Sequence, residues 1–253
     1  MKLYICANGF TVEQLNQAKE CVEKLERENH ECSMSEELSQ KLFHDRSHDT
    51  FSAEECELII SLGGDGALLK AAKTAIKAEK KLIGINTGRL GYLCAMSLNE
   101  LDDFDKIISG CKVSERKLLE LKCEDISAYA LNDIVVAKDN FGKTVDLKVD
   151  IEGLEEVMVR GDGVIICTPT GSTAYNLSAG GPRIDCDCDA IGMTPICAHD
   201  KNTYSIVIDG NKKIRISVNH ETTRVYADGE LIKETDQTVE VSRSDRVLKL
   251  CVR

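Results

Sequence analysis

Short apolar runs alternate with longer helical patterns along the first hundred residues. The runs at 3–6, 58–62 and 82–85 have the length of buried strands. After the first run, Thr11 and Gln14 have the spacing of a capping box, which marks the start of a helix. Apolar residues at helical spacing follow it, namely Leu15, Ala18, Val22 and Leu25. This alternation predicts an α/β domain with a parallel sheet.

The second and third apolar runs each lead into a glycine-rich segment. Gly63-Gly64-Asp65-Gly66 follows the second run directly and precedes a helical stripe, formed by Leu68, Leu69, Ala72 and Ile76. The third run leads into residues 86–91. Ser97 and Glu100 then repeat the capping-box spacing, and the helix that they start should stop near Gly110.

Beyond residue 110 the pattern changes to that of strands. Turn residues separate short segments of high β-propensity, at 117–123, 129–137, 144–151, 157–167, 205–208, 214–218, 224–227 and 238–242. We therefore predict an α/β domain over residues 1–98 and a mostly β domain over residues 99–242.

Composition narrows the class of protein. The 253 residues are 42% hydrophobic and 30% charged, and apolar runs such as 164–167 are far too short to cross a bilayer. The N-terminus lacks a signal-peptide pattern, so we expect a cytoplasmic protein without a membrane partner. A net charge of -11 argues against nucleic acid as a partner. The twelve cysteines lie within apolar runs and are expected to be thiols rather than disulfides.

The segment Gly63-Gly64-Asp65-Gly66 has the composition of a phosphate cradle. Glycines between a strand and a helix let the backbone approach a ligand, and the amides that begin the helix attract phosphate oxygens. A carboxylate here would repel phosphate unless it accepts a proton or holds a cation. Asp65 is therefore a candidate base for phosphoryl transfer to an alcohol. The alternative is a turn in which Asp65 only caps the helix.

Two common nucleotide-binding motifs are absent. The segment ending in Gly142-Lys143-Thr144 has Ala137 where a P-loop requires its first glycine. Leu69 stands where the dinucleotide-binding fingerprint requires its third glycine. A P-loop ATPase and an ordinary dehydrogenase are therefore disfavoured.

A second polar segment follows the apolar strand at 164–167. Arg160-Gly161-Asp162-Gly163 precedes this strand, and residues 168–182 after it are rich in hydroxyls, glycine and small residues. Such groups can satisfy ribose, carboxamide and phosphate together, with Tyr175 available for stacking. The alternative is a polar loop without a ligand.

These motifs, in this order, resemble those of the NAD kinase family over nearly the whole chain. The resemblance rests on residues 63–66, 84–93, 131–133, 161–163 and 168–182. The first motif also occurs in lipid kinases and sugar kinases, whereas the Thr-Pro-Thr-Gly-Ser-Thr-Ala-Tyr segment from residue 168 is specific. A lipid or sugar kinase, and a non-catalytic NAD sensor, remain the alternatives.

The resemblance implies that NAD binds in a cleft between the two domains. The first domain binds nucleotide and is completed by the C-terminal tail, about 243–253, and the β-rich domain binds NAD. Asp65 would act as base for the 2'-hydroxyl of the adenosine ribose. The residues that would contact ligands are Gly63, Gly64, Gly66, Asn86, Asn132, Asp133, Lys143, Arg160, Asp162, Thr173, Ala174, Tyr175, Asn176, Leu177, Ser178 and Glu230.

The resemblance also implies the remaining components of the reaction. The product would be NADP, the donor ATP or polyphosphate, and the metal Mg²⁺ or another divalent cation. A homodimer or homotetramer is expected. The chain departs from many family members at Ala67, where they have Thr, and at Asp133, where they have Glu.

Two further groups of residues could bind a metal but have simpler explanations. Cys186 and Cys188, with His199, lack a second cysteine pair at ligand spacing, so a solvated loop is expected. His44 and His48 are spaced for one face of a helix, in an acidic surface region. The acidic run from Glu20 to Glu37 is expected to be the exposed face of a helix and its loop.

Overall fold

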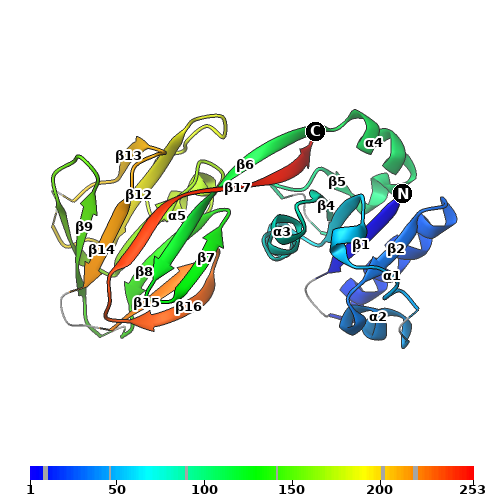
Figure 1. Cartoon of the computed structure of the whole chain (residues 1–253), viewed down its shortest axis with the longest axis horizontal. Helices are drawn as coiled ribbons and strands as arrows, with labels where there is room; N and C mark the ends of the chain where they lie inside the picture. The colour runs from blue at the N-terminus through cyan, green and yellow to red at the C-terminus, as the bar shows by residue number, and fades with distance from the viewer. Residues whose placement is uncertain (8–10, 46, 89–90, 141, 201–202, 219–221) are drawn as a thin grey trace. The chain divides into compact units, whose positions relative to one another are not determined.

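The computed structural model describes residues 1–7, 11–45, 47–88, 91–140, 142–200, 203–218 and 222–253 (Figure 1). The chain forms two compact units, one of residues 1–115 with 248–253 and the other of residues 116–247. The sequence places the boundary at residue 98, before the helix that ends at Gly110; in the structure that helix belongs to the first unit. No helix in the described ranges has the length and apolar character needed to cross a bilayer.

The first unit is the predicted α/β unit with a parallel sheet. Its strands pair in the order β4-β3-β1-β2, all parallel. The strands are β1 (Lys2–Ala7), β2 (Glu31–Met34), β3 (Leu58–Leu62), β4 (Lys81–Asn86) and the short β5 (Met96–Ser97). The helices are α1 (Val12–Arg27), α2 (Glu36–Phe43), α3 (Asp65–Ala78) and α4 (Phe104–Gly110), with 3-10 turns at Ala53–Glu55 and Leu98–Asp103.

The predicted capping boxes are confirmed. The Thr11 side chain accepts from the Gln14 amide at 3.2 Å, and the Gln14 side chain accepts from the Thr11 amide. Ser97 and Glu100 form the second box, at the 3-10 turn before α4. α1 buries the stripe Ala18, Cys21, Val22 and Leu25, and α4 ends at Gly110 as predicted.

The pair β2–α2 was missed. Residues 31–43 lie partly in the acidic run that the sequence suggests is an exposed helix face and loop, and that interpretation is wrong for β2. Ser33 gives the strand a polar pattern, yet its side chain is buried and its hydroxyl donates to the Phe51 carbonyl at 2.7 Å. A serine is read as an exposed position in a sequence pattern, although its hydroxyl can be buried when it has a hydrogen-bond partner inside the protein.

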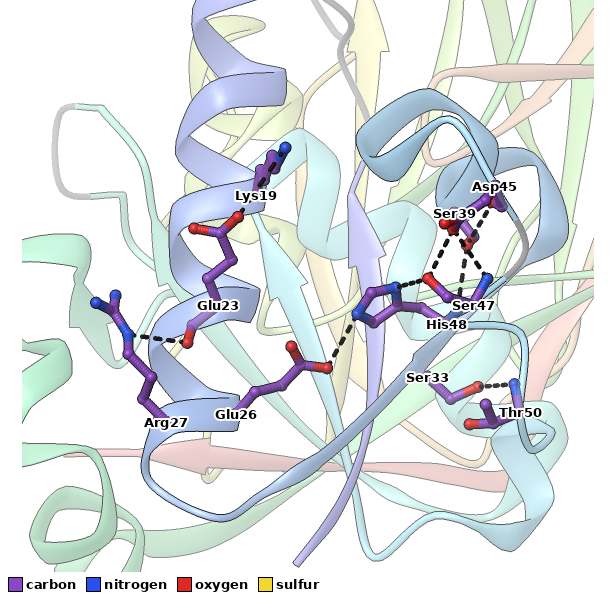
Figure 2. A network of polar contacts seen from close by, with 10 residues as sticks. All are labelled: Lys19, Glu23, Glu26, Arg27, Ser33, Ser39, Asp45, Ser47, His48 and Thr50. Atoms are coloured by element: carbon purple, nitrogen blue, oxygen red, sulfur yellow. Dashed lines mark hydrogen bonds and ion pairs between the residues drawn. The ribbon is translucent and has the colours of Figure 1, made fainter.

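His44 and His48 do not lie on one helix face. His44 ends α2 in a left-handed conformation, with φ 62°. His48 lies in the following loop, where Figure 2 shows its ring between Glu26 of α1 and Ser47. The His48 Nε2–Glu26 Oε1 distance is 3.0 Å, and the ring stacks on Phe43. This histidine therefore joins its loop to α1.

The second unit is mostly β, as predicted, and the strands of its six-stranded sheet pair antiparallel. One sheet has the order β13-β12-β11-β8-β15-β16. Its strands are β8 (Asp133–Lys138), β11 (Gly163–Cys167), β12 (Ala190–Ile196), β13 (Ile206–Asp209), β15 (Thr223–Ala227) and β16 (Glu230–Thr235). The sequence missed β12 and β16. Gly192 and Pro195 make β12 look like a loop, although Gly192 lies directly against the Cys167 thiol.

The remaining strands belong to the sheet that also contains β1 to β4. They are β6 (Lys112–Cys123), β7 (Ile126–Ala130), β9 (Val145–Ile151), β10 (Val157–Gly161), β14 (Ile214–Val218) and β17 (Val239–Val252). β17 pairs with β14 near its start and, in parallel, with β4 at Lys249 and Leu250. The last residues of the chain are thus part of the first unit.

Candidate functional site

The glycine turn connects a fully buried strand to a long helix. β3 is buried along its whole length, and α3 begins at Asp65 with Gly64 as its N-cap. The Gly64 carbonyl accepts from the amides of Ala67 and Leu68, at 3.0 and 3.1 Å. Among the described residues, a Cβ placed on Gly64 or Gly66 would meet no atom within 4 Å. The backbone therefore faces open space where the first amides of α3 begin, as a phosphate site requires.

Asp65 does not cap α3, so the capping interpretation is wrong. Its two carboxylate oxygens instead accept from the backbone amides of Tyr92 and Leu93, at 2.9 and 3.0 Å. Each oxygen has a second lone pair for another partner. The side chain is partly exposed and stays accessible. The motif at 84–93 thus contacts the first motif, although Arg89 and Leu90 lie outside the described residues.

Asn86 lies at the same edge of the sheet as Asp65. It is the last residue of β4, it is buried, and its Oδ1 accepts from the Gly88 amide at 2.6 Å. β3 and β4 are parallel neighbours with Leu62 opposite Ile85, so the segments that follow the two strands leave the sheet at the same edge. Ligands of parallel α/β sheets bind at the carboxyl ends of strands.

In the second unit, an aspartate that the sequence analysis did not select organises the turn at 131–133. Asp228 accepts from three consecutive backbone amides, those of Leu131 and Asn132 at 2.7 Å and that of Asp133 at 3.2 Å. Asp228 lies in the Asp-Gly turn between β15 and β16. That dipeptide signals a hairpin, but the sequence does not reveal which amides its carboxylate would meet.

Asp133 has an unusual environment for a carboxyl group. It is 5% exposed at the start of β8. Burial, together with the negative charge of Asp228, raises the pKa of Asp133 from 3.8 to about 7. A carboxyl group that titrates near neutral pH can both donate and accept hydrogen bonds.

The segment at 168–182 is bound to the same turn. The Thr168 hydroxyl donates to the Leu131 carbonyl at 2.6 Å and accepts from the Gly171 amide at 3.0 Å. A Cβ on Gly171 would lie 2.0 Å from the Asn132 carbonyl oxygen, so only glycine fits there. The structure thus brings the turn at 131–133 together with the start of the segment at 168–182.

The predicted residues at 173–178 face different environments. Asn176 is fully buried, where its amide donates to the carbonyls of Ser172 and Pro182 and its Oδ1 accepts from Thr194. Thr173 and Ala174 are partly buried, and Ser178 is exposed. Tyr175 and Leu177 are 46% and 45% exposed. The Asn176 side chain therefore holds the loop, while its neighbours remain available to a ligand.

The remaining predicted residues lie on or between strands of the second unit. The Arg160 guanidinium lies 3.5 Å from Asp146 on the neighbouring strand, and Asp162 pairs with Lys138 at 2.5 Å. Lys143 lines a cavity of about 230 Å³ together with Lys138. Glu230 begins β16 and is exposed.

The candidate residues are therefore divided between the two units. Gly63, Gly64, Asp65, Gly66 and Asn86 are in the first unit, and the others are in the second. Cys186 and Cys188 are free thiols. In the part of the chain that the structure describes, no three or more His, Cys, Asp or Glu side chains are grouped to hold a metal ion.

Comparison with known proteins matches both units to one family. The ATP-NAD kinase N-terminal domain model matches residues 2–112, and the C-terminal domain model matches residues 131–252. An NAD kinase of Bacteroides fragilis is 33% identical over 270 residues, covering 100% of this chain and 93% of that protein.

Two solved structures have the same fold. Yeast NADH kinase complexed with NADH has a TM-score of 0.87 at 23% identity, over 100% of this chain and 83% of that one. An NAD kinase from Archaeoglobus fulgidus in complex with ATP has a TM-score of 0.78 at 24% identity, over 99% and 93% of the two chains. Since both family models and a full-length relative agree, the chain belongs to the ATP-NAD kinase family.

Proposed function

We propose that this chain is an NAD kinase, which transfers the terminal phosphoryl group of ATP to the 2'-hydroxyl of the adenosine ribose of NAD. One observation carries the proposal: a carboxylate, Asp65, is held beside a glycine turn where a Cβ on Gly64 or Gly66 would meet no described atom within 4 Å. Phosphoryl transfer to an alcohol requires both a phosphate cradle and an acceptor for the hydroxyl proton.

In the proposed reaction, Asp65 accepts the proton of the 2'-hydroxyl while the ribose oxygen bonds to the terminal phosphorus. The bond from that phosphorus to the bridging oxygen breaks, and ADP leaves. The amides at Gly64 and Gly66 hold donor phosphates at the N-terminus of α3. The hydrogen bonds from Tyr92 and Leu93 fix the Asp65 rotamer, so the base is in place before the substrates arrive.

Mg²⁺ would enter as part of the donor complex. Mg²⁺ is usually bound by one or two carboxylates together with substrate phosphates, and it neutralises phosphate charge. Each Asp65 oxygen accepts one hydrogen bond from the described residues and has a second lone pair, so Asp65 fits as one such ligand. No cluster of protein ligands is required for this role.

We propose that the second unit supplies the contacts to NAD. The exposed Tyr175 ring and the Leu177 side chain offer apolar surface for a base, and Asn132 and Asp133 offer groups for ribose hydroxyls. The other proposed contacts are Lys143, Arg160, Asp162, Thr173, Ala174, Ser178 and Glu230. Asn176 would act by shaping the loop, because its amide nitrogen donates twice and its Oδ1 accepts once within the protein.

The purified protein, given NAD, ATP and Mg²⁺, should form NADP, as measured by chromatography of the products. Parallel reactions with polyphosphate in place of ATP, and NADH in place of NAD, identify the donor and acceptor. Binding of NAD without product from either donor would refute the kinase and favour a sensor. Phosphorylation of a lipid or a sugar instead of NAD would favour the other kinases.

We also propose that the protein is a homodimer or homotetramer, as its resemblance to the family implies. Native mass spectrometry at micromolar concentration should show two or four copies. A monomer that forms NADP at full rate would contradict this.

A further inference from the structure

Two cysteines outside the candidate site lie close together in the first unit. Cys111 follows the last residue of α4 and directly precedes β6, and Cys251 is the next-to-last residue of β17. β6 and β17 pair in one sheet. Both cysteines belong to the first unit, and both are free thiols. The pairing of the two strands thus brings together two thiols that are far apart in the chain.

The two thiols contact each other beside the core of the first unit. Cys251 is 2% exposed and belongs to that core, and Cys111 packs against it. Burial and the hydrogen bond with the Cys111 thiol raise the pKa of Cys251 to about 12. Opposed residues on paired strands have Cα atoms about 4.5–5.5 Å apart, and a disulfide spans about 4.4–6.8 Å. A bond between the two sulfurs is therefore compatible with the fold.

Cys111 is the accessible member of the pair. It is half-buried and lines a cavity of about 390 Å³. Two cations line the same cavity, and each is paired with a carboxylate. Lys106 lies 3.9 Å from Asp103, and Arg253 pairs with Glu100. Because these charges are paired, the cavity does not strongly attract an anion and suits a small neutral oxidant such as hydrogen peroxide.

Hydrogen peroxide can oxidise the two thiols in two balanced steps. In the first step, the Cys111 thiolate attacks a peroxide oxygen and the O–O bond breaks, which leaves a sulfenic acid on Cys111. The departing hydroxide takes up the thiol proton and leaves as water. In the second step, the Cys251 sulfur attacks the Cys111 sulfur, the S–O bond breaks, and the oxygen leaves as a second water with the Cys251 proton. Two thiols and one peroxide thus give one disulfide and two waters.

We propose that Cys111 and Cys251 are a thiol oxidation site that forms a reversible disulfide. Cys111 is the thiol that a peroxide oxidises, and Cys251 is the thiol that closes the bond. The thiols re-form when a small dithiol reduces the disulfide by exchange. The proposal is independent of the proposed function, since neither cysteine belongs to the candidate site.

The disulfide would cross-link two segments of special position in the chain. The chain passes from the first unit to the second within β6, and it returns to the first unit within β17. A bond between Cys111 and Cys251 would therefore enclose the whole second unit in one covalent loop. A disulfide that closes a long loop stabilises the folded state, because it restricts the unfolded chain. Oxidation of this pair should thus make the protein more stable.

Peptide mapping of the wild-type chain tests the proposal without any substitution. The folded full chain is treated with hydrogen peroxide, the remaining thiols are alkylated, and the digest is analysed by mass spectrometry. We expect a pair of peptides linked through Cys111 and Cys251, and its loss after treatment with dithiothreitol. Three results would overturn the proposal: a higher oxide of Cys111 without the link, a link from Cys111 to another cysteine, or no oxidation of either thiol.

Single substitutions test the separate roles of the two thiols. In Cys251→Ser, peroxide should leave a sulfenic acid on Cys111, which a cyclic diketone probe labels. In Cys111→Ser, Cys251 should stay reduced. Cys188→Ser is the control, because Cys188 is more exposed than Cys111, and this variant should form the link as wild type does. A label on Cys251 in Cys111→Ser would show that the assigned roles are wrong.

Urea unfolding measures the effect of the bond on stability. The unfolding midpoint of oxidised wild type should be higher than that of the reduced protein, and it should return after reduction. Cys188→Ser should show the same shift, whereas Cys251→Ser should show none. A lower midpoint in oxidised wild type would overturn the proposal, since a bond that fits the fold should not destabilise it.

Discussion

The carboxylate of Asp65 occupies the space that a side chain at Gly91 would need. A Cβ on Gly91 would come within 2.2 Å of Asp65 Oδ1 and 2.7 Å of Asp65 Cγ. The same carboxylate accepts from the amides of the next two residues, Tyr92 and Leu93. Two segments of glycine-rich sequence are thus held together by one acidic side chain, which in the proposed reaction is also the base.

Gly91→Ala should therefore disable the enzyme while leaving Asp65 in the chain. The added methyl group must displace the carboxylate or its loop, at a cost of about 1–3 kcal/mol in the free energy of unfolding. NADP formation should fall at least about tenfold. Urea unfolding and initial rates measure the two effects. Turnover equal to that of wild type would show that the position of Asp65 is not critical.

Gly66→Ala should weaken ATP binding without lowering the stability of the protein. A Cβ at this position meets no atom of the described residues within 4 Å, and alanine favours a helix over glycine by up to about 1 kcal/mol. The variant should thus be as stable as wild type or more stable. Its KM for ATP should rise, because the methyl group enters the space proposed for phosphate. An unchanged KM for ATP would argue against a phosphate site at this turn.

Asp228→Asn tests the three hydrogen bonds that hold the proposed NAD-binding turn at 131–133. The substitution removes the charge that strengthens three hydrogen bonds to Leu131, Asn132 and Asp133, which should cost about 1–3 kcal/mol of stability. KM for NAD should rise more than KM for ATP. Asp245→Asn, an exposed aspartate on β17, is the control and should change neither. Equal increases in both KM values would indicate a general loss of structure.

The raised pKa of Asp133 predicts a pH dependence of stability. Between its ordinary value of 3.8 and about 7, the folded protein keeps this carboxyl group protonated while the unfolded chain releases the proton. The folded state therefore binds more protons in this window, and its stability falls as pH rises through it. Asp133→Asn should remove this part of the pH dependence.

Urea unfolding of wild type and Asp133→Asn, at pH values below and above that window, measures the effect. The difference in stability between the two proteins should shift in favour of Asp133→Asn as pH rises. A constant difference would show that Asp133 titrates at its ordinary pKa. Asp228→Asn should shift the transition to lower pH, because the charge of Asp228 contributes to the raised pKa.

The sequence predicts best where one periodicity dominates. Local patterns predict the buried strand before Gly63, the capping boxes at Thr11 and Ser97, and most strands of the second unit. β2 and β12 were missed because Ser33, in β2, and Pro195, in β12, contradict the pattern of a buried strand. Whether these two residues fit in a strand depends on the residues that pack against them in the fold, and a local sequence pattern does not reveal those residues.

The candidate site shows the same limit. The glycines around Asp65 identify the turn from sequence alone, but the contact of Asp65 with Tyr92 and Leu93 joins residues far apart in the chain. Asp228 gave only a hairpin signal, because its three acceptor contacts lie nearly a hundred residues away. The family resemblance supplied the roles that spacing could not.

The most direct test of the central claim is NADP formation by wild type and Asp65→Asn, with NAD affinity measured for both. A general base contributes about 10²- to 10⁴-fold to a rate. We predict a loss of kcat in this range for Asp65→Asn, with NAD affinity within a few-fold of wild type. If Asp65→Asn kept most of its turnover, Asp65 would not be the base, and the proposed mechanism would be wrong.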